Sequence, residues 1–376
     1  MDGTKNMEEL LEARLKERLD CVGPLDREAM DRTGIRWDQI AKPLKSLGLL
    51  ETNVIRIAGI LGDSRVSLDK RALVAMCADN GVIEEGVTQS GSEVTAIVAQ
   101  NMAEGSSTVT VMAQAESVDV FPVDIGMVTE GDTVSGIPEE NEELKPRTML
   151  KRKIRRGTRN FAKEPAMTRQ EALQGILIGM EIAGRLQKQG YTVLATGEMG
   201  IGNTTTSSAV AAALLGEPVN RMTGKGAGLS DEGLERKIRV IGEALERWKP
   251  DPEDPLDVLS KVGGYDIAGL TGVFLGGAVY RIPVLIDGFI SSVAALLAQR
   301  LLPAARDFMV ASHVSKEPAG GLLLERLGLR PMLCCDMCLG EGTGAVAALS
   351  VLDMGLAVYH TMATFDDIHV EQYKPL

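Results

Sequence analysis

From residue 70 onward, short apolar runs alternate with longer segments whose apolar residues recur at helical spacing. The apolar runs predict strands over 71–79, 118–126, 191–198, 282–288 and 306–312. Segments such as 93–115 and 168–190 predict amphipathic helices between the strands. Since helices joining near-continuous apolar strands are typical of parallel sheets, the pattern predicts an α/β fold, an open parallel sheet with helices on both faces.

The two ends of the chain differ from this pattern. Residues 1–55 and 345–376 are mainly helical in pattern, whereas 56–344 contains the alternating strands and helices. We therefore predict a large α/β domain over 56–344 and a small helical domain, built from both termini, that closes over the site.

Four of the predicted strands end in an acidic residue that is followed, at once or after one residue, by glycine. These residues are Asp79, Asp124, Glu198 and Asp287. Acidic residues and glycines also begin ordinary turns, which explains any single case. Because the carboxyl ends of parallel strands form the ligand crevice, four together favour a site at one rim.

Composition narrows the class of partner. The 376 residues carry a formal net charge of −12, which disfavours non-specific binding to nucleic acid or an anionic membrane. The most apolar stretches are interrupted by charged residues, so they predict buried elements and not membrane spans. Five cysteines without framework spacing predict reduced thiols. We expect a cytoplasmic protein with small-molecule partners.

The stretch 196–208, TGEMGIGNTTTSS, predicts an anion site at a helix N-terminus. Gly200 and Gly202 would let the backbone approach a ligand, with the helix starting near Asn203 or Thr204. The loop has P-loop glycine spacing but lacks its lysine, so a monophosphate fits better than a triphosphate with magnesium. The alternative is that the glycines only permit close packing.

Two further glycine-dense loops contain candidate side chains. Residues 222–240 precede a helix with Lys237 and Arg239, either of which could reach an anion. Residues 338–345 place Glu341 between two glycines, which suggests a general base or an electrostatic stabiliser. The alternative for Glu341 is a turn residue that faces water.

Other polar clusters point to chemistry less strongly. The segment 334–338, CCDMC, has one C-x-x-C pair, whereas a structural zinc site needs four ligands, so idle thiols are favoured over a metal. The acidic and basic blocks of 130–159 predict a solvated surface loop. His313 follows a predicted strand and could touch a ligand.

Several segments, taken in order, resemble the nicotinate-nucleotide:dimethylbenzimidazole phosphoribosyltransferase family, which activates the lower ligand of cobalamin. The similarity runs from about residue 25 to near the C-terminus. The matching segments are 42–51, 78–95, 157–168, 196–205, 257–272, 283–292, 311–320 and 339–345. Each motif is short, but the ordered set is specific.

The resemblance implies transfer of the 5-phosphoribosyl group from nicotinate mononucleotide to 5,6-dimethylbenzimidazole. The products would be nicotinate and α-ribazole 5'-phosphate, formed with inversion at the anomeric carbon, for the nucleotide loop of cobalamin. It also implies a Rossmann-like sheet with a small helical domain, a homodimer, and no metal or organic cofactor.

By the same resemblance, Glu341 matches the catalytic base and Glu198 a second carboxylate that stabilises charge on the ribose or orients the acceptor. Ser90 and Asp287 match acceptor-side positions. The expected phosphate and ribose positions are Gly200, Gly202, Asn203, Thr204, Lys237, Ser315 and Gly340.

The chain departs from the family's usual pattern at four positions. Asn80, Val98 and Cys338 stand where histidine, glutamine and arginine are usual, and Lys45 replaces a glycine. Fewer polar groups near the acceptor leave open another benzimidazole, a purine or a phenol. A heteromer with a paralogue, or a non-catalytic paralogous subunit, is a further alternative, although a pure binder would need neither Glu198 nor Glu341.

Overall fold

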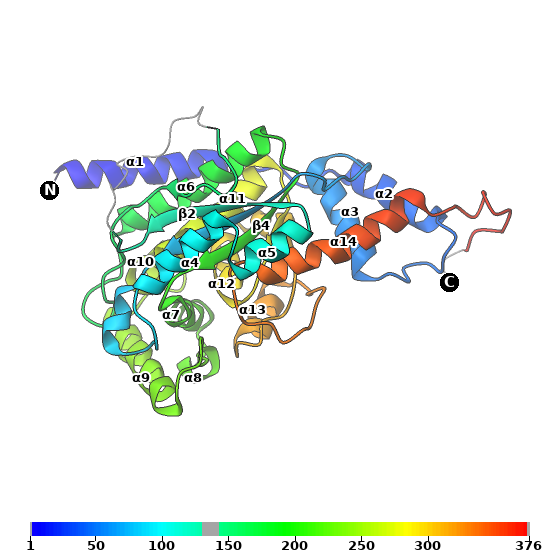
Figure 1. Cartoon of the computed structure of the whole chain (residues 1–376). Helices are drawn as coiled ribbons and strands as arrows, with labels where there is room; N and C mark the ends of the chain where they lie inside the picture. The colour runs from blue at the N-terminus through cyan, green and yellow to red at the C-terminus, as the bar shows by residue number, and fades with distance from the viewer. Residues whose placement is uncertain (1, 130–142, 374–376) are drawn as a thin grey trace.

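An open sheet of six parallel strands forms the centre of the molecule, with helices on both faces (Figure 1). The structure is a computed structural model that describes residues 2–129 and 143–373. The strand order is β3-β2-β1-β4-β5-β6, as in dinucleotide-binding folds. The strands are β1 (Arg71–Ala78), β2 (Val118–Gly126), β3 (Leu150–Lys151), β4 (Val193–Met199), β5 (Val284–Ile286) and β6 (Met309–Ala311).

This sheet confirms the predicted α/β fold and all five predicted strands. The short strand β3 was not predicted, since its two residues adjoin a basic block and show no apolar run. Two short 3₁₀ helices, η1 (Gly81–Glu85) and η2 (Pro303–Phe308), follow β1 and precede β6.

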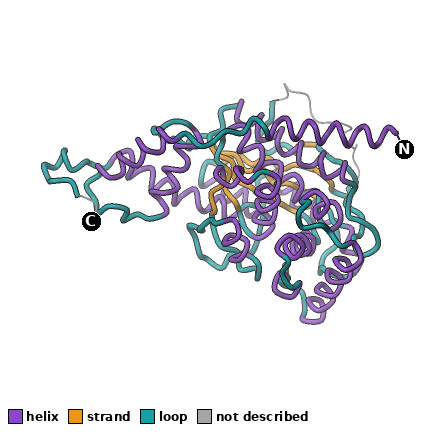
Figure 2. The backbone as a smooth tube through the Cα atoms, turned by 180° about the vertical axis from the view of Figure 1, so that it is seen from behind, coloured by secondary structure: helices purple, strands orange, loops and turns teal. Residues whose placement is uncertain are grey.

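The helices form a layer on each side of the sheet, as the views from front and back show (Figures 1 and 2). Val74 and Met76 of β1 pack into one core, while Ala75 and Cys77 pack into the other, because successive side chains of a strand point to opposite faces. Helices α6 (Arg169–Lys188), α11 (Tyr265–Tyr280) and α12 (Phe289–Leu301) contribute to the first core. Helices α3 (Leu49–Leu61), α4 (Glu93–Glu104), α5 (Thr108–Ala115) and α14 (Thr343–Thr361) contribute to the second.

Helices α6 and α11 lie in backbone contact. A Cβ atom on Gly179 would lie 1.9 Å from the carbonyl oxygen of Gly269, and one on Gly272 would lie 1.9 Å from that of Ile176. No side chain fits in these places, so glycine sets how closely the two helices approach. This packing fixes the start of α11 beneath the site.

The terminal segments divide between two locations. α2 (Arg27–Gln39) and α3 pack together beside the end of α14, where Ile40 pairs with Thr364, and this group projects from the sheet (Figure 1). In contrast, α1 (Asp2–Leu19) lies along α6, with Arg18 donating to the Tyr280 hydroxyl at 2.6 Å. The division into domains over 56–344 and over 1–55 with 345–376 stays a prediction.

Among the described residues, α14 alone is long and apolar enough to cross a membrane. Of its most apolar 18-residue window, 56% is buried inside the molecule. The core helix of a soluble protein meets the same criteria, and the sequence predicts this stretch as buried.

Part of the charged segment is not a solvated loop. Residues 130–142 lie outside the described residues, but Arg152 and Lys153 are buried. Lys153 Nζ lies 3.2 Å from an Asp124 carboxylate oxygen and donates to the Thr129 carbonyl at 2.7 Å. The expectation of a fully solvated segment is therefore wrong for these two residues, because a strand-end carboxylate supplies Lys153 with a buried partner.

Candidate active site

A cavity of about 370 Å³ opens at the carboxyl ends of the strands. The chain continues from β1 to one edge of the sheet and from β4 to the other, so a crevice is expected between these two strands. Every predicted site residue except Lys237 lines the cavity: Ser90, Glu198, Gly200, Gly202, Asn203, Thr204, Asp287, Ser315, Gly340 and Glu341.

The four strand-end carboxylates divide into two pairs. Glu198 and Asp287 line the cavity. Asp79 accepts from Thr95 Oγ1 at 2.6 Å and from the backbone N–H of Val128 at 2.8 Å, and Asp124 pairs with Lys153. The strand-end pattern therefore marks the correct rim, but Asp79 and Asp124 hold neighbouring loops in place.

The loop after β4 leads directly into α7 (Asn203–Leu215), whose N-terminus faces the cavity. Gly202 caps the helix with φ 91°, a backbone conformation that favours glycine. A Cβ on Gly200 would lie 2.2 Å from the Ala78 carbonyl oxygen, so the loop rests on β1. This geometry makes a helix N-terminus available to an anion.

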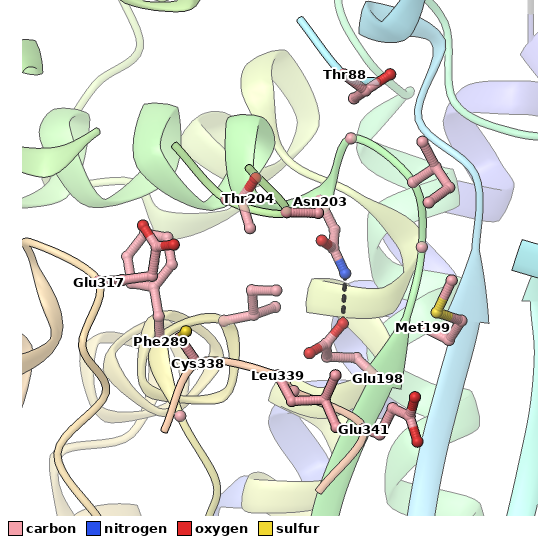
Figure 3. Close-up of a pocket in the computed structure, with 18 of the residues that line it drawn as sticks. Thr88, Glu198, Met199, Asn203, Thr204, Phe289, Glu317, Cys338, Leu339 and Glu341 are labelled. Carbon is pink, nitrogen blue, oxygen red and sulfur yellow. Dashed lines mark hydrogen bonds between the residues drawn. The ribbon is translucent and has the colours of Figure 1, made fainter. Parts of the chain in front are cut away.

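Asn203 has a structural role at the second carboxylate. Its side-chain amide donates to Glu198, as Figure 3 shows, and its backbone N–H donates to the Gly200 carbonyl at 3.2 Å. The amide therefore orients Glu198, while the predicted contact of Asn203 with phosphate stays a prediction.

Glu198 lies in an acidic, buried environment. Burial, together with the nearby charges of Asp266 and Asp287, raises the pKa of Glu198 well above its usual range. Burial likewise raises the pKa of Asp266 to about 7 and that of Asp287 to about 7. The protonated forms of these carboxyl groups are therefore favoured, and a positive charge placed nearby would favour their ionised forms.

Glu341 is held in a strained, buried turn. Its φ is 62°, between Gly340 at 87° and Gly342 at 100°, and the residue is only 9% exposed. Its Oε2 accepts the backbone N–H of Val109 at 3.1 Å, near the start of α5. Burial raises the pKa of Glu341, which suits a general base. The alternative of a turn residue facing water is wrong.

Asp287 holds the loop that carries Glu341. Its carboxylate accepts backbone N–H groups from Gly342 at 3.3 Å, Gly344 at 2.7 Å and Ala345 at 3.1 Å, at the first turn of α14. A carboxylate at a helix N-terminus is electrostatically favourable. The contact of Asp287 with the acceptor stays a prediction.

Lys237 approaches the cavity from behind α7. It lies on α9 (Asp231–Trp248) and donates to Thr204 Oγ1 at 2.8 Å and to the Gly224 carbonyl at 3.2 Å. Burial lowers the pKa of Lys237 to about 8. Arg239, the other sequence candidate, is exposed. Ser315 Oγ, on the far wall, accepts the backbone N–H of Glu317 at 3.3 Å.

Two acidic groups of the site were not singled out from the sequence. Asp266 lies in the first turn of α11, and its Oδ2 lies 3.4 Å from the Cβ position of Gly200, beneath the loop. Glu317 lines the cavity wall. Neither residue ends a predicted strand. Asp266 and Glu317 lie within the matching segments 257–272 and 311–320, but nothing in those segments indicates that they belong to the site.

The positions that depart from the family pattern lie in three settings. Val98 and Cys338 line the cavity, while Asn80 donates from below to the Ile201 carbonyl at 3.3 Å. Lys45 has a positive φ of 57°, a backbone conformation that glycine adopts more easily than lysine, and glycine is the usual family residue at this position. His313 also lines the cavity, and burial lowers its pKa.

The thiols of Cys334, Cys335 and Cys338 are exposed and free. Within the described ranges, no group of three or more His, Cys, Asp or Glu residues is arranged to hold a metal ion.

A family model described as "Phosphoribosyltransferase" matches residues 22–370. The chain belongs to this phosphoribosyltransferase family. This confirms the resemblance drawn from the motifs.

Named relatives extend along nearly the whole chain. "Nicotinate-nucleotide--dimethylbenzimidazole phosphoribosyltransferase" of Ruminiclostridium cellulolyticum is 46% identical over 361 residues, covering 96% of this chain and 99% of the relative. The protein of the same name from Acetivibrio thermocellus is 45% identical, with the same coverage. The crystal structure of CobT from Thermus thermophilus matches with a TM-score of 0.84 at 39% identity, over 92% of this chain and all of that one.

Gly197 of this phosphoribosyltransferase sets the position of Glu341. A Cβ on Gly197 would lie 2.2 Å from the Glu341 carbonyl oxygen and 2.7 Å from its carbonyl carbon. We predict that Gly197→Ala displaces the Glu341 turn and lowers kcat by a factor on the order of 10 to 100, as small misplacements of a reacting group do. Steady-state kinetics, with circular dichroism to check folding, measures the effect.

Gly242→Ala is the matched control. Gly242 lies on α9 with no atom within 4 Å of its Cβ position, so alanine is expected to leave kcat unchanged. Equal kcat in Gly197→Ala and Gly242→Ala would show that the Glu341 turn tolerates displacement.

Proposed function

We propose that this chain transfers the 5-phosphoribosyl group of nicotinate mononucleotide to a nitrogen of 5,6-dimethylbenzimidazole. The products are nicotinate and α-ribazole 5'-phosphate, used in the nucleotide loop of cobalamin. The observation that carries the proposal is one cavity that joins the buried carboxylates of Glu198 and Glu341 to the N-terminus of α7. The names of the relatives agree with it.

Glu341 serves as the general base. It removes the proton from the benzimidazole N–H, and the other ring nitrogen attacks C1' of the ribose as the bond to nicotinate breaks. Attack on the face opposite the leaving group inverts the anomeric centre. The leaving pyridinium becomes neutral when it takes the bonding electrons, so it needs no acid.

Glu198 stabilises the positive charge of the donor and of the ribose in the transition state. Burial and the neighbouring carboxylates raise its pKa, which favours the protonated form. A cationic pyridinium nearby lowers that pKa and favours the carboxylate. Asn203 keeps the carboxylate in place through its amide.

The 5'-phosphate binds at the N-terminus of α7, between Thr204 and Ser315, with Lys237 supplying positive charge. Support comes from the hydrogen bond that joins Lys237 Nζ to Thr204 Oγ1. Gly200, Gly202 and Gly340 let the backbone approach the donor closely.

We predict that kcat/KM for nicotinate mononucleotide falls as the pH rises through about 8, because Lys237, whose pKa is lowered to about 8, loses its charge there. Below this pH the ammonium is intact and binds phosphate. Lys237→Met is expected to raise KM by about 10- to 100-fold, because one charge-assisted hydrogen bond to the phosphate is lost. The same substitution should remove the decline of kcat/KM with pH. A pH profile of both proteins measures the change, and an identical decline in Lys237→Met would assign it to another group.

A panel of acceptor bases tests the proposed function. The purified protein is incubated with nicotinate mononucleotide and dimethylbenzimidazole, another benzimidazole, a purine or a phenol, and ribotide formation is followed. We expect dimethylbenzimidazole to be used best. Val98 and Cys338 in the lining are the reason to include the other bases. If a purine or a phenol is turned over faster than dimethylbenzimidazole, the proposed acceptor is wrong, but the proposed phosphoribosyl transfer still holds.

We also propose a cytoplasmic homodimer, with a heteromer of paralogous subunits as the alternative. Large apolar side chains are exposed on the projecting helices, with Ile35 58% and Met354 60% exposed. A second copy would cover them. Light scattering on the purified chain gives its molar mass, and a monomer would contradict the dimer.

A further inference from the structure

Glu317 is an acidic side chain at the proposed phosphate end of the cavity. It lies between β6 and α13 (Gly320–Leu327), in the wall opposite Thr204 (Figure 3). Its carboxylate packs on the backbone of Gly224, since a Cβ there would lie 2.0 Å from Glu317 Oε2. That oxygen is buried and has no hydrogen-bond partner among the described residues.

The same glycine links Glu317 to Lys237. The carbonyl oxygen of Gly224 accepts from Lys237 Nζ at 3.2 Å, while Glu317 covers the Cβ position of Gly224. Burial raises the pKa of Glu317 and lowers the pKa of Lys237 to about 8. The charges of the two groups oppose these shifts, since Glu317 favours the protonated form of Lys237 and Lys237 favours the ionised form of Glu317. Ser315, which accepts the backbone N–H of Glu317, completes this cluster.

A carboxylate in this position opposes the binding of a second anion. Phosphate placed between Thr204 and Ser315 would lie close to the Glu317 carboxylate, and like charges at close range disfavour each other. The Glu317 carboxylate partly offsets the charge of the buried Lys237 ammonium. A bound phosphate would interact with the same ammonium, so the phosphate and the carboxylate would compete for it.

We propose that Glu317 is an internal counter-ion of the phosphate site, which competes with substrate phosphate for Lys237 and the N-terminus of α7. This inference rests on the proposed function only in placing a phosphate there. Its consequence is selectivity: free inorganic phosphate binds weakly, whereas the donor gains further contacts through its ribose and nicotinate. Glu317 is thus a specificity-determining residue that takes no part in the proton transfer.

The test compares inorganic phosphate binding to the full-length wild type and Glu317→Gln by calorimetry at neutral pH, where Lys237 is protonated. Loss of the competing charge is expected to tighten phosphate binding by a factor on the order of 10 or more. In kinetics with nicotinate mononucleotide, the change falls on KM more than on kcat. Glu325→Gln, at an exposed position of α13, is the matched control and should bind phosphate as the wild type does.

Glu317→Asp retains the charge and should keep weak phosphate binding, which separates charge from packing. Unchanged or weaker phosphate binding by Glu317→Gln would overturn the inference, as would tight binding by Glu317→Asp. The titration requires no turnover, so an inactive protein that binds phosphate as described would refute the proposed reaction and leave this inference standing.

Discussion

Replacing Glu341 with glutamine is expected to lower kcat by a factor on the order of 100 or more, since general bases typically contribute this much. The amide is nearly the same size, and its oxygen can still accept the backbone N–H of Val109, which Glu341 accepts at 3.1 Å. The turn should therefore survive while the ability to accept a proton is lost. Steady-state kinetics at saturating donor and acceptor measures the change.

The pH dependence adds a second readout for Glu341. Burial raises its pKa, so wild-type activity should fall as the pH drops through this raised value and the carboxylate takes up a proton. Glu341→Gln should show no such decline. The exposed Glu325→Gln variant should match the wild type in both measurements. A Glu341→Gln enzyme with wild-type kcat would remove Glu341 from the role of base.

Replacing Glu198 with glutamine is the second change expected to be severe, lowering kcat by a factor on the order of 100, as loss of one group that stabilises a developing charge does. The side-chain oxygen of glutamine can still accept the hydrogen bond that the Asn203 amide donates to the Glu198 carboxylate in the native chain. Since only the ability to ionise is lost, the defect should fall on kcat and leave folding intact.

Glu235→Gln, at an exposed position of α9, is a control for the loss of one carboxylate outside the cavity lining. Thermal unfolding of both variants should separate stability from catalysis. Because burial among other carboxylates disfavours the ionised form of Glu198, a neutral glutamine in its place should not destabilise the fold. If Glu198→Gln and the wild type have equal kcat, Glu198 does not stabilise the positive charge on the ribose.

The fold could be predicted because the strands are strongly apolar. Central strands buried on both faces need continuous apolar runs, and all five long runs form strands. The two-residue β3 carries no such signal, since it belongs to the sheet only through pairing with Val123 and Asp124 of β2. The position of α1 on α6 likewise depends on long-range contacts of Arg18 that no local pattern encodes.

The candidate site could be located, but its internal bonding could not. Glycine loops and strand-end acids mark the rim, and the ordered motifs mark the family. That Asp287 holds the Glu341 turn, and that Asn203 holds Glu198, follows only from distances in the folded chain. Asp266 and Glu317 stayed unmarked for the same reason.

The central claim is that one cavity couples release of nicotinate to formation of an α-ribotide. The most direct test incubates the purified chain with nicotinate mononucleotide and dimethylbenzimidazole, quantifies both products, and assigns the anomeric configuration by nuclear magnetic resonance. We predict equal amounts of nicotinate and α-ribazole 5'-phosphate. Nicotinate released without ribotide, a β-configured product, or no turnover with any base would contradict the account.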